Sequence, residues 1–267
     1  IVRTAEYPVT AIEVTVSGIT AEALKQALAP IATGLGVDIA VQSAGIIRQG
    51  ARLVVMDVDS TLIQDEVIDL LAREAACESA VAEVTARAMA GELDFADSLK
   101  QRVAALAGTP VSALDTVRES VRLTPGARTL CRTLNSLGYR LALVSGGFSE
   151  IVGPLAEQLG IHRYRANNLE VADGRLTGRV IPPIVDRAGK ALALREFAEE
   201  FGFALSRTVA IGDGANDLDM LATAGLGVAF NAKPAVVAAA DASVSAPYLD
   251  SVLYLLGITR EQVDALS

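Results

Sequence analysis

An apolar run that ends at two aspartates constrains this chain more than any other part of its sequence. Residues Leu53–Met56 are all apolar, which is typical of a strand buried on both faces of a parallel sheet, and Asp57 and Asp59 follow. Residues i and i+2 of an extended segment point to the same side, so both carboxylates can face one point. Neighbouring negative charges favour a cation between them, and Mg²⁺ prefers oxygen ligands. The motif therefore indicates a metal site, with a strand capped by an Asx-turn as the simpler alternative.

Two later apolar runs also end in polar groups. Residues 139–144 lead to Ser145, and residues 208–211 lead to Asp213. Because helical patterns alternate with these strands, the sequence predicts an α/β fold with a mostly parallel, doubly wound sheet. Such sheets bind ligands at the carboxyl ends of their strands. We therefore expect Asp57, Ser145 and Asp213 to meet at one edge of the sheet.

A long helical region separates the first strand from the second. Short apolar stripes divided by Gly and Pro predict several helices within residues 67–138, inserted as a cap over the end of the first strand. The catalytic core is then expected to comprise residues 48–66 and 139–267. Asp173-Gly174, between two short strand patterns, predicts a β-hairpin in the core.

The amino-terminal residues 1–47 predict a small α+β unit of strand, helix and strand. The strands are expected around Val9–Val16 and Val37–Val41, and Thr20 is a good N-cap for the helix between them. Such a unit is too small to cover its own apolar faces, so upstream residues or a second subunit should complete it. A homodimer formed through this segment is therefore expected. The pattern resembles the second half of an ACT domain, a small regulatory fold often found on amino-acid enzymes.

Composition narrows the range of partners and chemistries. A formal net charge of -9 argues against a broad nucleic-acid-binding surface. No uncharged stretch reaches the roughly 18 residues of a membrane span, and the two cysteines, Cys77 and Cys131, are expected to be reduced thiols in a cytoplasmic protein. The single histidine, His162, excludes a zinc site built from several histidines. A small-molecule substrate is the remaining expectation.

The residues at the strand ends suit phosphoryl transfer. A carboxylate that attacks phosphorus forms an aspartyl-phosphate, which divides one difficult displacement into two easier steps. The reaction also needs positive charge, donors for the phosphoryl oxygens and a proton for the leaving alkoxide. The chain offers a candidate for each role: Asp57 as nucleophile, Asp59 as acid and then base, Asp213 for Mg²⁺, Lys190 for charge, and Ser145 with the Gly146 amide for the oxygens.

Four motifs in order resemble the haloacid dehalogenase superfamily and, within it, the phosphoserine phosphatase family. They are D-x-D-S-T at 57–61, S-G-G at 145–147, the isolated Lys190, and G-D-G-A-N-D at 212–217, and the resemblance covers roughly residues 50 to 257. It implies that Asp57 is the nucleophile and Asp59 the proton donor. It also implies that Mg²⁺ is held by Asp57, the Asp59 carbonyl oxygen and Asp213, with Asp217 in support, and that Asn216 helps to place the phosphate.

The same resemblance implies a zwitterionic substrate. Glu66 would bind its ammonium group and Arg102 its carboxylate, while Met89 and Phe95 of the cap would shield the site. Arginine can hold a carboxylate through two parallel hydrogen bonds, which agrees with this role. The implied activity is Mg²⁺-dependent hydrolysis of O-phospho-L-serine, the last step of serine biosynthesis.

Other functions remain open at this stage. A phosphotransferase, or a phosphatase of the same superfamily with another small substrate, would use identical catalytic residues. A phospho-accepting regulator without turnover is a further alternative, although a receiver domain lacks both a helical cap and a separate S-G-G motif. Ion-pumping ATPases share the aspartate chemistry but need membrane spans.

Overall fold

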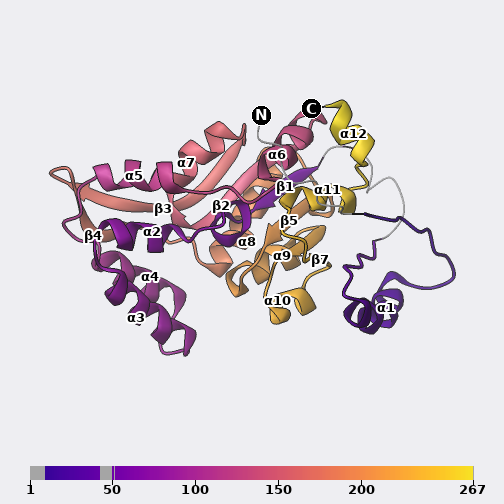
Figure 1. Ribbon diagram of the computed structural model, residues 1–267, viewed down its shortest axis with the longest axis horizontal. Coiled ribbons are helices and arrows are strands. Elements are labelled where there is room, and N and C mark those ends of the chain that lie inside the picture. The colour runs from indigo at the N-terminus through magenta and orange to yellow at the C-terminus, as the bar shows by residue number, and fades with distance from the viewer. Residues whose placement is uncertain (1–9, 43–49, 51, 267) are drawn as a thin grey trace.

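A seven-stranded sheet lies at the centre of the protein, in a computed structural model that describes residues 10–42, 50 and 52–266 (Figure 1). The strand order is β4-β3-β2-β1-β5-β6-β7, and every neighbouring pair is parallel except the hairpin β3–β4. The predicted doubly wound sheet is therefore confirmed, as is the hairpin around Asp173-Gly174. The strands are β1 (Leu53–Met56), β2 (Arg140–Phe148), β3 (Arg163–Ala172), β4 (Arg175–Ile181), β5 (Thr208–Gly212), β6 (Leu226–Phe230) and β7 (Ala242–Val244).

Helices cover both faces of this sheet. Alternate residues of β1 point to opposite sides, so Val54 and Met56 join one apolar core while Leu53 and Val55 join the other. Two-sided cover explains why β1, β5 and β6 are buried along their whole lengths. The core helices are α6 (Ala127–Ser136), α7 (Ser149–Gln158), α8 (Arg187–Glu200), α9 (Leu218–Thr223), α10 (Pro234–Ala239), α11 (Val252–Leu255) and α12 (Arg260–Ala265), with 3₁₀ turns at Leu205–Arg207, Ala215–Asp217 and Leu249–Ser251. None of the described helices combines the length and the apolar character that crossing a membrane requires.

Five helices lie between β1 and β2, and the four that precede α6 form an inserted group. They follow a tight turn at Val58–Leu62 and are α2 (Val67–Glu74), α3 (Glu78–Met89), α4 (Phe95–Ala104) and α5 (Ser112–Ser120). In Figure 1 they lie at one end of the molecule beside the β3–β4 hairpin, which Val111 contacts by donating its N–H to the Gly174 carbonyl at 3.0 Å. We propose that the chain divides into a cap within residues 67–138 and a core of residues 48–66 and 139–267, with one change. Helix α6 packs against β2, so it belongs with the core rather than the cap.

The parallel register brings the ends of the central strands level. Met56 pairs with Leu143 of β2 on one side and with Ile211 of β5 on the other. The next residue, Asp57, donates its N–H to the Ile211 carbonyl at 2.9 Å. The residues that follow β1 and β5 therefore leave the sheet at the same height, which is the condition for a shared site.

The amino-terminal segment contains the predicted helix but not the predicted strands. Helix α1 (Ala21–Leu35) begins at Thr20, whose hydroxyl accepts from the Ala23 N–H. Residues 10–19 and 37–42 form no strand, and Val9 lies outside the described residues. The strand prediction was wrong for these stretches because alternation alone supplies no hydrogen-bonded neighbour, and the described residues offer none there. The segment contacts the core instead, where the Asp38 carboxylate accepts from the Ser245 N–H at 2.7 Å.

The two thiols should differ sharply in reactivity. Cys131 lies in the core of the sheet, and burial raises its pKa to about 12, whereas Cys77 is only half-buried, with a pKa raised by burial and by Glu78. Because the thiolate is the reactive form, we expect iodoacetamide at pH 8 to alkylate Cys77 in the folded protein and Cys131 only after unfolding. Peptide mass spectrometry of native and denatured samples measures this. Equal labelling rates of Cys131 in both samples would contradict the packing described above.

Candidate active site

A buried lysine lies between two carboxylates at the end of β1. Lys190 is 1% exposed, and its Nζ is 2.8 Å from Asp57 Oδ2 and 2.7 Å from Asp217 Oδ1. The lysine occupies the first turn of α8. The N-cap of this helix is Asp186, whose side chain accepts from the Gly189 N–H. The other oxygen of Asp57 accepts from the Val58 N–H at 2.7 Å. The position of Asp57 is thus fixed by both a charge and a backbone donor.

Burial and charge set the protonation of this group. Burial alone would lower the pKa of Lys190, but the Asp57 and Asp217 carboxylates outweigh it and raise that pKa above its ordinary value. The lysine therefore stays cationic. Burial raises the pKa of Asp57, and the Asp217 carboxylate adds to this, while Lys190 opposes both. Asp57 consequently depends on nearby positive charge to remain ionised.

Three carboxylates gather at this point, which fits a divalent cation. Asp57, Asp213 and Asp217 each place an oxygen within 4.8 Å of the others. Burial, with Asp217 adding to it, raises the pKa of Asp213 to about 6, so these groups repel one another. One lysine does not balance three carboxylates, and an all-oxygen donor set suits a hard divalent ion.

The hydrogen bonds within the cluster indicate which carboxylates are available to a metal. Asp217 already accepts from the N–H groups of Asp213 and Gly214, at 3.2 and 3.0 Å, in addition to its contact with Lys190. Within the described part of the chain, the Asp213 carboxylate accepts a single hydrogen bond, from the Thr61 hydroxyl at 3.1 Å. Asp57 and Asp213 are therefore the better placed ligands, and Asp217 the supporting carboxylate.

Asp59 has an environment suited to proton transfer. Its Oδ1 accepts from the Val67 N–H at 2.8 Å and its Oδ2 accepts from the Ser145 hydroxyl at 3.1 Å. Burial, with repulsion from Glu66 added, raises the pKa of Asp59 to about 6. A carboxyl group with a pKa in this range can give up and take back a proton near neutral pH. Its carboxylate lies outside the three-aspartate cluster.

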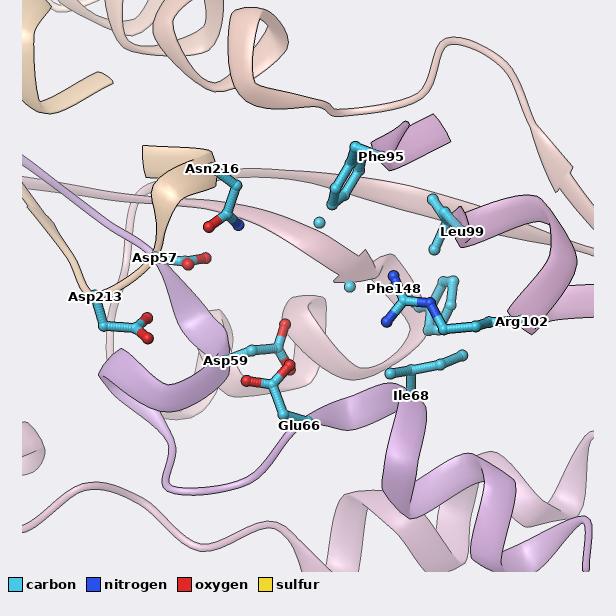
Figure 2. Close-up of a pocket in the computed structure, with 12 residues that line it drawn as sticks. Asp57, Asp59, Glu66, Ile68, Phe95, Leu99, Arg102, Phe148, Asp213 and Asn216 are labelled. Carbon is cyan, nitrogen blue, oxygen red and sulfur yellow. The ribbon is translucent and has the colours of Figure 1, made fainter. Parts of the chain in front are cut away.

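A cavity of about 130 Å³ opens beside these groups. Its lining residues are Asp57, Asp59, Glu66, Ile68, Phe95, Leu99, Arg102, Gly146, Gly147, Phe148, Asp213 and Asn216. Figure 2 shows Arg102 reaching from α4 toward the side on which Asp59 and Glu66 lie. The carboxylates of Asp57, Asp59, Glu66 and Asp213 thus lie on one side of the cavity, and the Arg102 guanidinium lies on the other.

Phe95 of the cap lies directly on the core loop. A Cβ atom built on Gly146 would be 2.8 Å from the Phe95 ring, closer than such atoms approach in proteins. Only glycine at this position therefore allows the ring to lie where it does. This contact joins the cap and the core across the cavity, which agrees with the shielding role expected of Phe95.

Most residues singled out by sequence line the cavity, but four do not. Lys190 and Asp217 lie beneath it, in contact with Asp57. Ser145 is buried behind the wall, where its hydroxyl donates to Asp59 and accepts from the Gly147 N–H, so it does not face the cavity as expected for a phosphoryl contact. Met89 ends α3 with 73% of its surface exposed, so the structure does not place it as a shield.

Three apolar lining residues were missed by sequence reasoning. Ile68, Leu99 and Phe148 line the cavity and lie around Arg102 in Figure 2. A signal existed for Leu99, because it follows Phe95 by four positions and precedes Arg102 by three on the same helix face. No comparable signal marked Phe148, which resembles ordinary core.

Comparisons with known proteins agree with this geometry. A sequence model of haloacid dehalogenase-like hydrolases matches residues 54–222, and a model of the ACT domain matches residues 1–42. The chain is 65% identical to a phosphoserine phosphatase of Streptomyces coelicolor over 99% of its own length, but it spans only 65% of that relative. It is 50% identical to a phosphoserine phosphatase of Streptococcus thermophilus, over 76% of this chain and 95% of that one.

A solved structure gives the same result. It is described as a phospho-aspartyl intermediate analogue of phosphoserine phosphatase, and it superimposes with a TM-score of 0.73 at 38% identity, covering 79% of this chain and all of that one. The family match includes β1, the insert, β2 and β5, which carry the carboxylates and the cavity. On this sequence and structural likeness, the chain belongs to the haloacid dehalogenase-like hydrolase family.

Proposed function

We propose that the protein is a Mg²⁺-dependent phosphatase that hydrolyses O-phospho-L-serine to L-serine and inorganic phosphate. The observation that carries this proposal is the distribution of charge around the cavity. Asp57, backed by Lys190, lies on one side with Asp59 and Glu66 next to each other, and the Arg102 guanidinium lies across the cavity from them (Figure 2). A phosphate beside Asp57, with an amino acid's ammonium beside Glu66 and its carboxylate beside Arg102, would match these charges. The names of the relatives described above support the same substrate.

In the proposed reaction Asp57 Oδ attacks phosphorus and the bond from phosphorus to the serine oxygen breaks. Asp59 donates its proton to that oxygen, which leaves as the L-serine hydroxyl. Asp59, now ionised, then takes a proton from a water molecule whose oxygen attacks phosphorus and releases phosphate from Asp57. Lys190 balances charge throughout. Mg²⁺, held by Asp57, Asp213 and the Asp59 carbonyl oxygen, would supply positive charge to the phosphoryl oxygens.

Recognition of the amino-acid part of the substrate is assigned to Glu66 and Arg102. Glu66, whose Oε1 accepts from the Ser60 hydroxyl at 2.6 Å, would face the ammonium group. The half-buried Arg102 is anchored by its Nε–H, which donates to the Ser98 carbonyl at 3.4 Å, and its remaining donors would hold the carboxylate. Asn216 and the Gly146 amide would contact the phosphate.

The test is phosphate release from a panel of phosphorylated small molecules. We expect turnover of O-phospho-L-serine to exceed that of phosphothreonine, phosphoethanolamine and sugar phosphates, to stop with EDTA, and to return with Mg²⁺. Equal turnover of all substrates would contradict the proposal that Glu66 and Arg102 bind the ammonium and carboxylate groups. Adding glycerol or another alcohol as acceptor, and measuring its phosphorylation, separates hydrolysis from phosphotransfer.

Removing the arginine should reduce activity only toward substrates with a carboxylate. We expect Arg102→Ala to lower kcat/KM for phosphoserine roughly 100-fold, because truncating one partner of a buried charge pair costs several kcal/mol. Phosphoethanolamine, which lacks the carboxylate, should lose less than about threefold. Arg87→Ala is the matched control, since Arg87 is an exposed arginine of the cap that pairs with Glu92. If Arg102→Ala leaves the ratio between the two substrates unchanged, Arg102 does not bind the carboxylate.

The setting of the enzyme is also proposed. We place it in the cytoplasm, in keeping with its free thiols, and we propose a homodimer formed through the amino-terminal segment. Ile12 and Val14 of that segment are 85% and 73% exposed, and neighbouring exposed apolar groups favour association. Light scattering on the wild type and on Ile12→Asp/Val14→Asp tests the dimer, and an unchanged mass would contradict this contact.

A further inference from the structure

We propose that Asn167 is a positioning residue for the phosphoryl end of the cavity, an inference that rests on the proposed phosphatase function. Its side chain holds the loop that presents Gly146 and connects it to the segment that begins the helix of Lys190. Asn167 itself lies outside the cavity lining, on β3. It belongs to none of the motifs that suggested the function.

The need for such a residue arises from the pairing of β2 with β3. Val144 pairs with Arg165, and Phe148 pairs with Asn167. Three residues of β2, 145–147, therefore lie opposite the single residue 166 of β3, so β2 carries two extra residues. A bulge of this kind interrupts the ladder and leaves backbone groups without cross-strand partners. The three residues opposite residue 166 are the S-G-G motif.

The Asn167 side chain supplies a hydrogen-bond partner for one of these backbone groups. Its Nδ2–H donates to the Gly146 carbonyl at 2.8 Å, and its side chain is fully buried. The N–H of the same peptide unit, on Gly147, donates to Ser145 Oγ at 2.8 Å. One peptide is thus held at both its oxygen and its nitrogen. Two consecutive glycines would otherwise rotate more freely than any other pair, and Gly146 lines the cavity against Phe95.

The other half of the Asn167 amide fixes a second segment. Its Oδ1 accepts from the Val185 N–H at 2.8 Å. Val185 is buried and immediately precedes Asp186, the N-cap of α8. The Asp186 carbonyl accepts from the Lys190 N–H at 2.9 Å. A single side chain therefore connects the Gly146 loop with the start of the helix that delivers the lysine. The donor faces a carbonyl and the acceptor faces an N–H, so the orientation of the amide is determined by its partners.

A residue that only filled the core would affect stability without affecting the phosphoryl site. The proposal predicts a different result when the two hydrogen bonds are removed. Asn167→Leu keeps the size of the side chain but neither bond. Asn135→Ala is the control, because Asn135 also donates to backbone carbonyls, those of Leu159 and Gly160, but lies outside the cavity lining.

The experiment measures binding of orthovanadate and of inorganic phosphate to full-length protein with Mg²⁺, together with the melting temperature. We expect Asn167→Leu to weaken vanadate binding at least tenfold and to lower kcat by 10- to 100-fold, with binding of L-serine changed less than twofold. Asn135→Ala should lower the melting temperature and leave vanadate binding within twofold of the wild type. Should the leucine variant fail to fold, Asn167→Ser is measured in the same way.

The outcomes separate this inference from the function on which it rests. A folded Asn167 variant that binds vanadate as tightly as the wild type overturns the positioning role. If the wild type binds vanadate but releases no phosphate from phosphoserine, the proposed substrate fails while Asn167 is still tested with p-nitrophenyl phosphate. If the wild type binds neither vanadate nor phosphate, both are wrong.

Discussion

Replacing Asp57 with Asn is expected to reduce phosphate release by at least about 10⁴-fold, the scale seen when a catalytic nucleophile is removed. The amide is nearly the same size, but its oxygen is a poor nucleophile and one negative charge is lost from the acidic cluster. Because burial and Asp217 make the charged form of Asp57 unfavourable, its removal should not lower the melting temperature of the metal-free protein. Mg²⁺ should stabilise the variant less than it stabilises the wild type. Steady-state kinetics and thermal unfolding with and without Mg²⁺ measure both effects.

The control for this variant is Asp219→Asn. Asp219 is a carboxylate of α9 that pairs with Arg187 at the surface, so its loss should change kcat less than about twofold. An Asp57→Asn enzyme that folds and retains substantial activity would exclude covalent catalysis by this residue.

Replacing Lys190 with Met is expected to affect both stability and rate. The variant keeps the length of the side chain but leaves Asp57 and Asp217 buried without their shared cation. Breaking a buried ion pair on one side costs about 3–5 kcal/mol, and we expect a loss of that size in the free energy of unfolding without metal. Activity should fall roughly 10³-fold or more, as when a donor that stabilises developing charge is removed. Guanidinium unfolding in EDTA and steady-state kinetics give the two values.

The stability loss should depend on pH in a definite direction. Without Lys190 the charge that opposes burial is lost, so the pKa of Asp57 rises further and the folded variant favours the protonated carboxyl. A group whose pKa is raised on folding stabilises the folded state at low pH, and this stabilisation disappears as the pH rises through the folded-state pKa. The difference in the free energy of unfolding between the variant and the wild type should therefore be larger at pH 8 than at pH 5.

A lysine from the surface provides the control. Lys100→Met removes an exposed pair with Asp97 and should cost less than about 1 kcal/mol at either pH. If the loss of unfolding free energy in Lys190→Met instead grows as the pH falls, the lysine does not offset buried carboxylates.

The parts of this fold that sequence could predict depend on local pattern. Buried parallel strands read as short apolar runs, and their level ends follow from the sheet, so the convergence of Asp57 and Asp213 could be expected before any coordinates. The insertion of helices after β1 was readable for the same reason. Residues whose role depends on local spacing, such as Asp59 two positions after Asp57, could also be predicted from the sequence.

What sequence could not predict depends on contacts between distant segments. The position of Met89 depends on how α3 packs on α4, which helical periodicity does not reveal. The strands expected beside α1 needed partners that alternation cannot supply. The bonds of Asn167 follow from a two-residue register shift between β2 and β3, and nothing in either strand's sequence announces that shift.

The central claim is that the Asp57 side chain itself becomes phosphorylated. The most direct measurement mixes enzyme, Mg²⁺ and O-phospho-L-serine, quenches with acid within the first turnover, and locates the phosphoryl group by mass spectrometry of peptic peptides. We predict a phosphoryl group on Asp57, absent from the Asp57→Asn variant. Phosphate release with no phosphorylated enzyme, or a phosphoryl group on a different residue, would contradict the account.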